Sequence, residues 1–277
     1  MNGHAVWAIV RKDLATVVRN RGVRIPLLVT PIVILVLLPI LLVGGASMLV
    51  DGPIPMQEIG SEGEPGGGPF GEERQDEIAR GETGEARWAI FVLEVFLAPL
   101  YLLVPLLVAT VIAADSFAGE RDRRTLEALL HTATTDRELL TAKFLAAWLP
   151  AMTVSLAGFV VYSVLANVLA YPALGRVFFP TATWLLLALW VTPPLAGLGM
   201  ALMVIASSRV KSLQAAHQIG SLVVLPVLVL LVAQVTGALL LDIRRVVLLG
   251  AFLWVSALVA LMVGVQTLRR QRLAVRL

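Results

Sequence analysis

Apolar residues along this chain are grouped in long blocks separated by short polar segments, and they show no period of 2 or 3.6 residues. A block of about 20 apolar residues matches the ~30 Å hydrocarbon core of a bilayer when it forms a helix. The pattern therefore predicts an all-α membrane protein with six transmembrane helices. The predicted spans are residues 25–50, 88–114, 144–170, 181–206, 219–241 and 246–268.

Two of these predictions rest on lengths. Only residues 242–245 separate the last two blocks, and a single helix through both would be about twice as long as the bilayer is thick. We therefore expect a tight turn at the membrane surface there. The first block is much longer than the roughly 7–15 apolar residues of a cleaved signal peptide, so it is expected to be a retained span.

Prolines interrupt five of the six predicted spans, and each one removes a backbone donor. The pair Pro193-Pro194 is expected to break the fourth span. The small residues just after it, Ala196, Gly197, Gly199 and Ala201, favour close helix packing. Kinks are common in membrane helices, so these prolines do not by themselves indicate a gate.

Composition excludes several classes of protein. Charged residues make up 15% of the chain and hydrophobic residues 58%, whereas a soluble domain has about 25% charged residues. The basic residues lie at the edges of the apolar blocks and form no single patch, so no nucleic-acid partner is expected. The absence of cysteine excludes disulfides, thiolate nucleophiles and cysteine-bound metals.

The distribution of Lys and Arg predicts the orientation. With the N-terminus in the cytoplasm, 16 basic residues fall in inside segments and 6 in outside segments, as the positive-inside rule requires. An even number of spans then places both termini in the cytoplasm, and the protein in the cytoplasmic membrane. The outside loop 51–87 holds ten acidic and three basic residues and is rich in Gly and Pro. It is predicted to be a flexible acidic spacer; a cation-collecting vestibule is the alternative.

Glu94 is the only clearly intramembrane ionisable residue in the predicted spans. A carboxyl group at mid-bilayer costs about 2–3 kcal/mol or more, so Glu94 is either paired with a neighbouring helix or part of a transport pathway. Asn167 and Gln234 are expected to form hydrogen bonds across helices. The three histidines have no metal-ligand spacing and no Gly-Lys dipeptide is present, which excludes a Walker A loop. Catalysis, metal binding and cofactor binding within this chain are therefore not expected.

The segment 115–143, between the second and third spans, carries the most distinctive pattern. Leu126, Leu129 and Leu130 have the spacing of one face of a short helix, and Thr135 and Glu138 have capping-box spacing. This predicts a rigid cytoplasmic projection made of a short amphipathic helix, a turn and a new helix. A solvated loop helix is the plainer alternative.

Residues 120–143 resemble the coupling-helix region of type-two ABC exporter permeases. The family pattern is roughly Glu-Arg-Glu-x-Gly-Thr-Leu-Glu-x-Leu-Leu, followed by Thr-Pro and Glu-Leu-Leu-x-Gly-Lys. The matching residues are Glu120, Arg121, Thr125, Leu126, Glu127, Leu129, Leu130, Thr132, Glu138, Leu139, Leu140 and Lys143. The chain departs from the pattern at Asp122, Arg124, Ala133 and Ala142.

The resemblance implies a permease half that works with a second half, identical or paralogous, and with two cytoplasmic ATPase subunits that bind ATP and Mg. It assigns ATPase coupling to Glu120, Arg121, Asp122, Arg123, Arg124, Thr125, Leu126, Glu127, Leu129 and Leu130. Residues 1–24 resemble the amphipathic connecting helix of the family. Its basic residues should lie at the inner surface, where anionic lipids attract each by about 1 kcal/mol; these are Arg11, Lys12, Arg19, Arg21 and Arg24.

The sequence leaves two other functions open. A stand-alone secondary carrier or channel should show internal repeats and several buried charges, and neither is visible in the sequence. A membrane assembly subunit without transport is the third possibility. The nearly uncharged interior favours a lipophilic or amphipathic cargo, with sodium export as an alternative that the resemblance allows.

Overall fold

The computed structural model describes residues 3–45, 84–116, 136–209, 214, 218, 220, 222–236, 238–239 and 241–274. This part of the chain is helical and contains no β-strand, which confirms the all-α class. Some helices include π-helical turns, labelled η. The elements are α1 (Gly3–Arg19), α2 (Arg21–Ile32), η1 (Val33–Leu37), η2 (Ile40–Gly44), α6 (Gly84–Ile90), η3 (Phe91–Phe96), α7 (Leu97–Ala114), α10 (Asp136–Leu174), α11 (Ala182–Leu186), η5 (Leu187–Val191), α12 (Thr192–Arg209), α14 (Leu225–Val235) and α15 (Ile243–Ala274).

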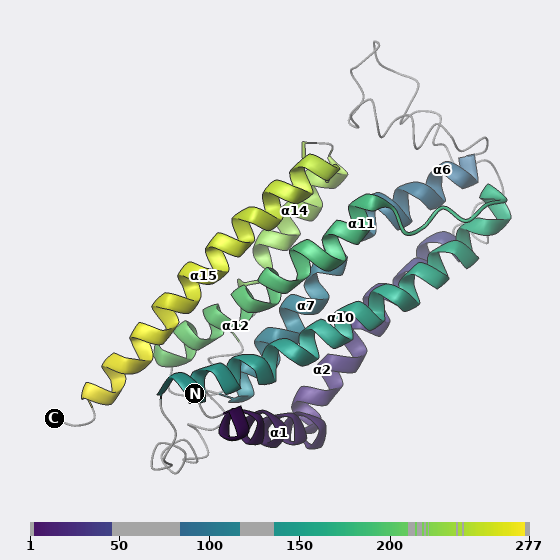
Figure 1. Cartoon of the computed structure of the whole chain (residues 1–277). Coiled ribbons are helices and arrows are strands. Elements are labelled where there is room, and N and C mark those ends of the chain that lie inside the picture. The colour runs from purple at the N-terminus through teal and green to yellow at the C-terminus, as the bar shows by residue number, and fades with distance from the viewer. Residues whose placement is uncertain are drawn as a thin grey trace.

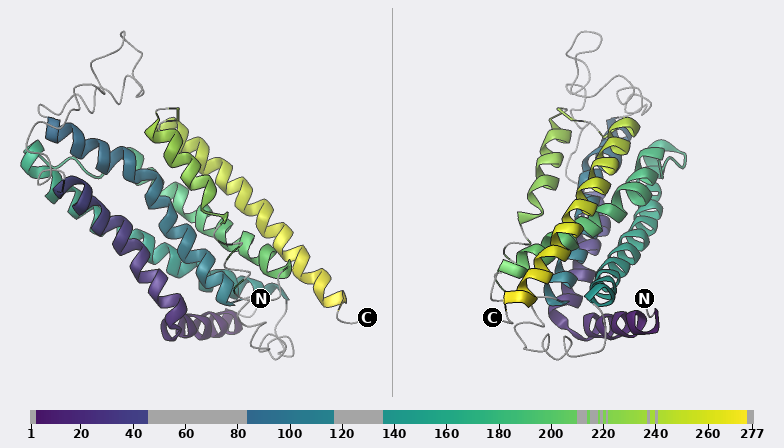
Figure 2. Two further views of the ribbon diagram at one scale, coloured as in Figure 1. Left: turned by 180° about the vertical axis from the view of Figure 1, so that it is seen from behind. Right: turned by 60° about the vertical axis from the view of Figure 1, so that its left-hand side comes forward.

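The long helices run side by side as an inclined bundle, and α1 lies across its lower end (Figure 1). α7 runs through the middle, where it packs against α10, α12, α14 and α2. α15 packs along the outer side of α12, and the view from behind shows α2 on the opposite flank (Figure 2). The first and last helices both end at the lower end of the bundle, so the two described chain ends lie on the same side (Figure 1).

Five helical stretches are long and apolar enough to cross a membrane: Arg21–Gly44, Gly84–Ala114, Thr141–Leu174, Ala182–Ser207 and Ile243–Gly264. They overlap five of the six predicted spans. The remaining predicted span, the fifth in chain order at 219–241, contains α14, which has only 11 residues. At 1.5 Å per residue this helix covers roughly 16 Å, about half of the hydrocarbon core. The predicted count of six is therefore not confirmed.

The central helix is more deeply buried than the outer helices. In the stretch from Gly84 to Ala114, 78% of the most apolar window is buried, against 11% for Arg21–Gly44 and 28% for Ile243–Gly264. A helix that is apolar on all sides and buried forms the core of a bundle, whereas an apolar and exposed face is suited to lipid. α7 is thus the core helix, and the outer helices present apolar faces to the bilayer.

The fourth predicted span was expected to break at Pro193-Pro194, but the helix is continuous there. The helix continues from Ala182 to Arg209, with the turn η5 directly before the two prolines. The two prolines follow the π-helical turn η5 after one residue, Thr192, and the helix accommodates them without a break. The expected close packing after them is confirmed, because a Cβ on Gly199 would lie 2.9 Å from Leu106 Cδ1 and 3.3 Å from Leu106 O on α7.

Candidate functional site

α1 is attached to the bundle by one face of the helix. Val6, Val10, Asp13 and Val17 are its buried residues, and their spacing of four, three and four places them on one side. Val6 and Val10 pack with Ala142, near the start of α10. The apolar contact between α1 and α10 therefore includes one acidic side chain.

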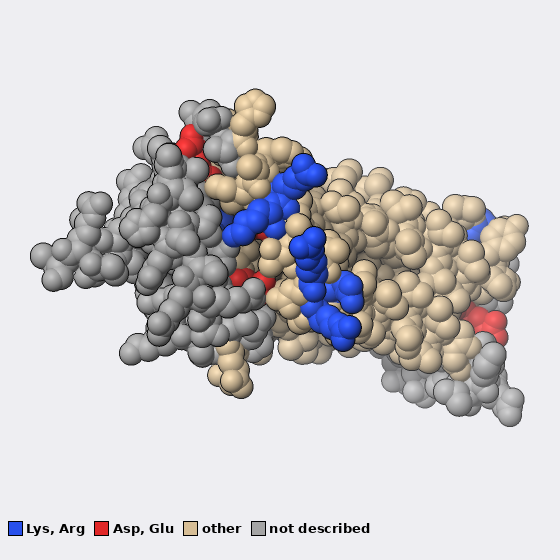
Figure 3. All heavy atoms as spheres, turned by 90° about the horizontal axis from the view of Figure 1, so that it is seen from below, with Lys and Arg blue, Asp and Glu red and all other residues tan. Residues whose placement is uncertain are grey.

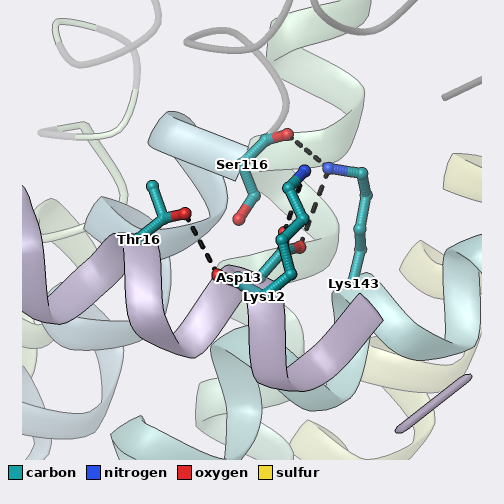
Figure 4. Close-up of polar contacts among 5 residues, drawn as sticks. All are labelled: Lys12, Asp13, Thr16, Ser116 and Lys143. Atoms are coloured by element: carbon teal, nitrogen blue, oxygen red, sulfur yellow. Dashed lines mark hydrogen bonds and ion pairs between the residues drawn. The ribbon is translucent and has the colours of Figure 1, made fainter. Parts of the chain in front are cut away.

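The acidic residue faces a buried lysine. Lys143 of α10 has only 1% of its side chain exposed, and its Nζ lies 3.9 Å from Asp13 Oδ2 (Figure 4). The same Nζ donates a hydrogen bond of 2.6 Å to the carbonyl oxygen of Ser116, just beyond α7. Lys12 Nζ lies 3.5 Å from Asp13 Oδ1, but half of the Lys12 side chain is exposed. A buried ammonium group needs such partners to offset the loss of its hydration.

A second polar contact holds the corner between α1 and α2. Asn20 interrupts the helix with extended backbone angles, and its Oδ1 accepts from Gly22 N at 3.0 Å as the N-cap of α2. Its Nδ2 donates to Asp115 Oδ1 at 3.0 Å, next to the end of α7. We call the five residues Asp13, Asn20, Asp115, Ser116 and Lys143 the basal junction. They join α1, α7 and α10 on both sides of residues 117–135.

The residues predicted to couple to an ATPase lie inside that interval and outside the described residues. They are Glu120, Arg121, Asp122, Arg123, Arg124, Thr125, Leu126, Glu127, Leu129 and Leu130. Most of the acidic loop, residues 51–83, also lies outside the described residues. The amphipathic helix, the ATPase contact and the loop's role therefore stay predictions.

The basic residues of the predicted connecting helix are described. Arg11, Lys12 and Arg19 are exposed on α1, whereas Arg21 and Arg24 belong to the first turns of α2 because Asn20 separates the two helices. Figure 3 views the molecule from below and shows Lys and Arg side chains gathered over this end. Within residues 3–25 the sole acidic residue is the buried Asp13, so the exposed side of this segment is strongly basic.

Glu94 lies in the turn η3 with only 4% of its surface exposed, in the interior of the bundle. Pro99, five residues later, has no N–H to donate to the carbonyl of Val95 at position i−4 or to that of Glu94 at i−5. Two side chains supply donors instead. Trp184 Nε1 donates to Glu94 O at 3.1 Å, and Gln234 Nε2 donates to Val95 O at 2.8 Å.

A third donor reaches the same turn, because Tyr162 Oη donates to the carbonyl of Leu93. Three consecutive carbonyls of η3 thus accept hydrogen bonds from α10, α11 and α14. Tyr162 and Trp184 are also stacked, with ring centroids 4.8 Å apart. We call this set the η3 cluster: Leu93, Glu94, Val95, Tyr162, Trp184 and Gln234.

Sequence reasoning identified part of these sites. The predicted cross-helix hydrogen bond of Gln234 is confirmed, while Asn167 instead binds the segment after α10, with Phe179 O at 2.7 Å. The roles of Tyr162, Trp184 and Asp13 were missed. For Asp13 a signal existed, since one acidic residue in a basic amphipathic helix, aligned with its apolar face, indicates a buried partner.

Comparison with known families identifies the chain. A family model described as ABC-2 family transporter protein matches residues 7–272, which is nearly the whole length. No curated protein that was compared is similar to it. The chain therefore belongs to the ABC-2 transporter family, whose members are membrane-embedded permease subunits that do not themselves carry out catalysis.

Proposed function

We propose that this chain is the permease half of an ATP-driven exporter, assembled with a second permease half and two cytoplasmic ATPase subunits that bind ATP and Mg. The observation that carries the proposal is the family match over residues 7–272. The basal junction supports it, because residues on both flanks of the segment 117–135 are joined to each other and to Asn20 at the end of α1 by hydrogen bonds. A force applied to that segment would reach α1, α7 and α10 together.

The proposed topology has six crossings with both termini in the cytoplasm. Five long helices alone would place the chain ends on opposite sides, yet α1 and the end of α15 lie at the same end of the bundle (Figure 1). The chain must return between Arg209 and Ile243, and α14 lies in this return. The end that carries Arg11, Lys12 and Arg19 is assigned to the cytoplasm by the positive-inside rule.

The docking contact of the proposal is a helix in a groove. Leu126, Leu129 and Leu130 would be buried in the ATPase subunit, and the charged residues around them would orient the contact. Replacing Leu126 and Leu129 with Asp should reduce the recovery of the ATPase on the tagged chain at least tenfold. The control is Ala128→Asp, which adds a single aspartate on the opposite side of the predicted helix. Equal recovery with the double variant would refute the docking assignment.

The proposal as a whole is tested by affinity purification of the tagged chain from its native cell in mild detergent, followed by mass spectrometry. A stoichiometric ATPase with a Walker A loop supports it, and the presence or absence of a paralogue decides between a heterodimer and a homodimer. If no ATPase is recovered, a secondary carrier becomes the better function. The observation in its favour is the buried Glu94, which would then be the residue to replace first.

We further propose a lipophilic or amphipathic cargo. Within the described spans, the buried interior is apolar apart from a few polar side chains, and three of these, Tyr162, Trp184 and Gln234, are used in hydrogen bonds to the backbone of η3. The test is stimulation of ATP hydrolysis by a panel of amphipathic compounds and by sodium chloride in reconstituted vesicles. Stimulation by sodium alone would overturn this cargo class.

A further inference from the structure

The basal junction places opposite charges inside an apolar contact. Lys143 and Asp13 are 1% and 5% exposed at their side chains, and the residues packed beside them are Val6, Val10 and Ala142. Apolar side chains alone would hold α1 against α10. A buried ion pair favours one relative position of the two helices, because displacing α1 from α10 would separate the two buried charges.

The junction also fixes a third helix. Lys143 reaches Ser116 on one side of α7's end, and Asn20 reaches Asp115 on the other, with donor–acceptor distances of 2.6 and 3.0 Å. Residues 115 and 116 are themselves buried, with 6% and 8% exposed. Two independent polar contacts from different elements therefore hold the residues directly before position 117, and one of them comes from just after position 135.

We propose that Asp13 and Lys143 are positioning residues that make α1 and the adjoining ends of α7 and α10 one rigid block. This inference rests on the proposed function, because the block would carry the displacement imposed on residues 117–135 by an ATPase. Asn20 extends the block to the start of α2 through its cap. In this arrangement the contact between α1 and α10 stays closed throughout the ATP cycle, and movement occurs elsewhere in the bundle.

Cross-linking tests whether the contact stays closed. The chain contains no cysteine, so Val10→Cys and Ala142→Cys can be introduced together without other changes. They lie in the same buried cluster on α1 and α10. In the complete complex in lipid vesicles, the oxidised double variant should hydrolyse ATP within twofold of its reduced form. A loss of tenfold or more that reduction restores, and that neither single-cysteine variant shows, would overturn the proposal.

Substitution tests the positioning role separately from docking. Lys143→Met keeps the length of the side chain but removes its charge, and it should leave the ATPase bound while changing ATP hydrolysis per complex at least fivefold. The exchanged pair Asp13→Lys with Lys143→Asp restores the ion pair but not the hydrogen bond to Ser116 O, so its hydrolysis should lie at least twofold closer to the original than that of Lys143→Met. Thr16→Val is the control on the same helix, because it removes only a 3.1 Å hydrogen bond to Lys12 O within α1.

The outcomes separate this inference from the proposed function. If the unmodified chain recovers no ATPase, the proposed function fails and the inference fails with it. If the ATPase is recovered, but Lys143→Met hydrolyses ATP like Thr16→Val, the proposed function stands and the positioning role is refuted. If the exchanged pair remains as impaired as Lys143→Met although it is produced and binds the ATPase, the two charges do not act as a pair.

Discussion

Gln234→Leu removes the side-chain donor that reaches η3 from α14. The amide is fully buried, and its Nε2 lies 2.8 Å from Val95 O. An α-helical backbone donor cannot replace it, because the residue at i+4 from Val95 is Pro99. Leucine has a similar volume, so the variant loses a hydrogen bond without opening a large cavity.

The expected loss of stability of Gln234→Leu follows from two known ranges for the free energy of a lost hydrogen bond. Leaving a buried acceptor without its partner costs about 1–3 kcal/mol. Hydrogen bonds between helices of a membrane protein average about 0.6 kcal/mol and reach about 1.7 kcal/mol, since other partners are often found. Pro99 removes the nearest other partner, but leucine also removes the buried Gln234 Oε1, which has no hydrogen-bond partner among the described residues, so we expect about 1 kcal/mol, at the lower end of the overlap of the two ranges. By the scaling for domains of 150–250 residues, this lowers Tm by roughly 2–4 °C.

Thermal unfolding in mild detergent, followed by circular dichroism, measures the shift. Thr236→Val is the matched control, because it removes an exposed hydroxyl that only bonds its own helix. The decisive measurement is a double-mutant cycle with Pro99→Ala, which returns an N–H to the chain near Val95. Gln234→Leu should cost at least about 0.5 kcal/mol less in the Pro99→Ala background, the size at which coupling exceeds ordinary additivity error. Equal costs in both backgrounds would refute the account of η3.

Two further predictions concern packing and the segment after α10. Gly199→Val should destabilise the chain by about 1–3 kcal/mol, since its side chain would meet the backbone of Leu106, whereas Gly44→Ala, with open space around it, should change Tm little. Equal shifts in thermal unfolding would contradict this contact. Asn167→Leu removes the acceptor for two backbone N–H groups at 178–179 and the donor to Phe179 O, so limited proteolysis within 175–181 should accelerate at least fivefold. Unchanged cleavage would show that other contacts hold this segment.

The apolar blocks predicted where the long helices lie, because a helix that crosses the bilayer needs about 20 mostly apolar residues whichever helices it packs against. The same signal could not show that α14 has only 11 residues, since composition does not determine where a helix ends. Pro193-Pro194 misled the prediction for a related reason. A proline's effect depends on the hydrogen-bond pattern of the turn before it, and here that turn is the π-helical η5, which hydropathy does not show.

The candidate sites divide along similar lines. The burial of Glu94 could be predicted from its place in an apolar block, but its neighbours Trp184 and Gln234 come from distant helices. Asn20 between two arginines carried a local signal, because Asn is a preferred N-cap, and it marks the boundary between α1 and α2. The pairing of Asp13 with Lys143 needed the structure, since neither residue's neighbours in the sequence indicate the other.

The basal junction also fixes a sequence of events during synthesis. Lys143 follows Asp13 by 130 residues. At roughly 5–20 residues per second, its ion-pair partner is translated about 7–26 s after Asp13. During that interval α1 carries an acidic group on its apolar face before Lys143 has been made. The contact of α1 with α10 is therefore a late step of biogenesis, because it can form only once the start of α10 has been translated.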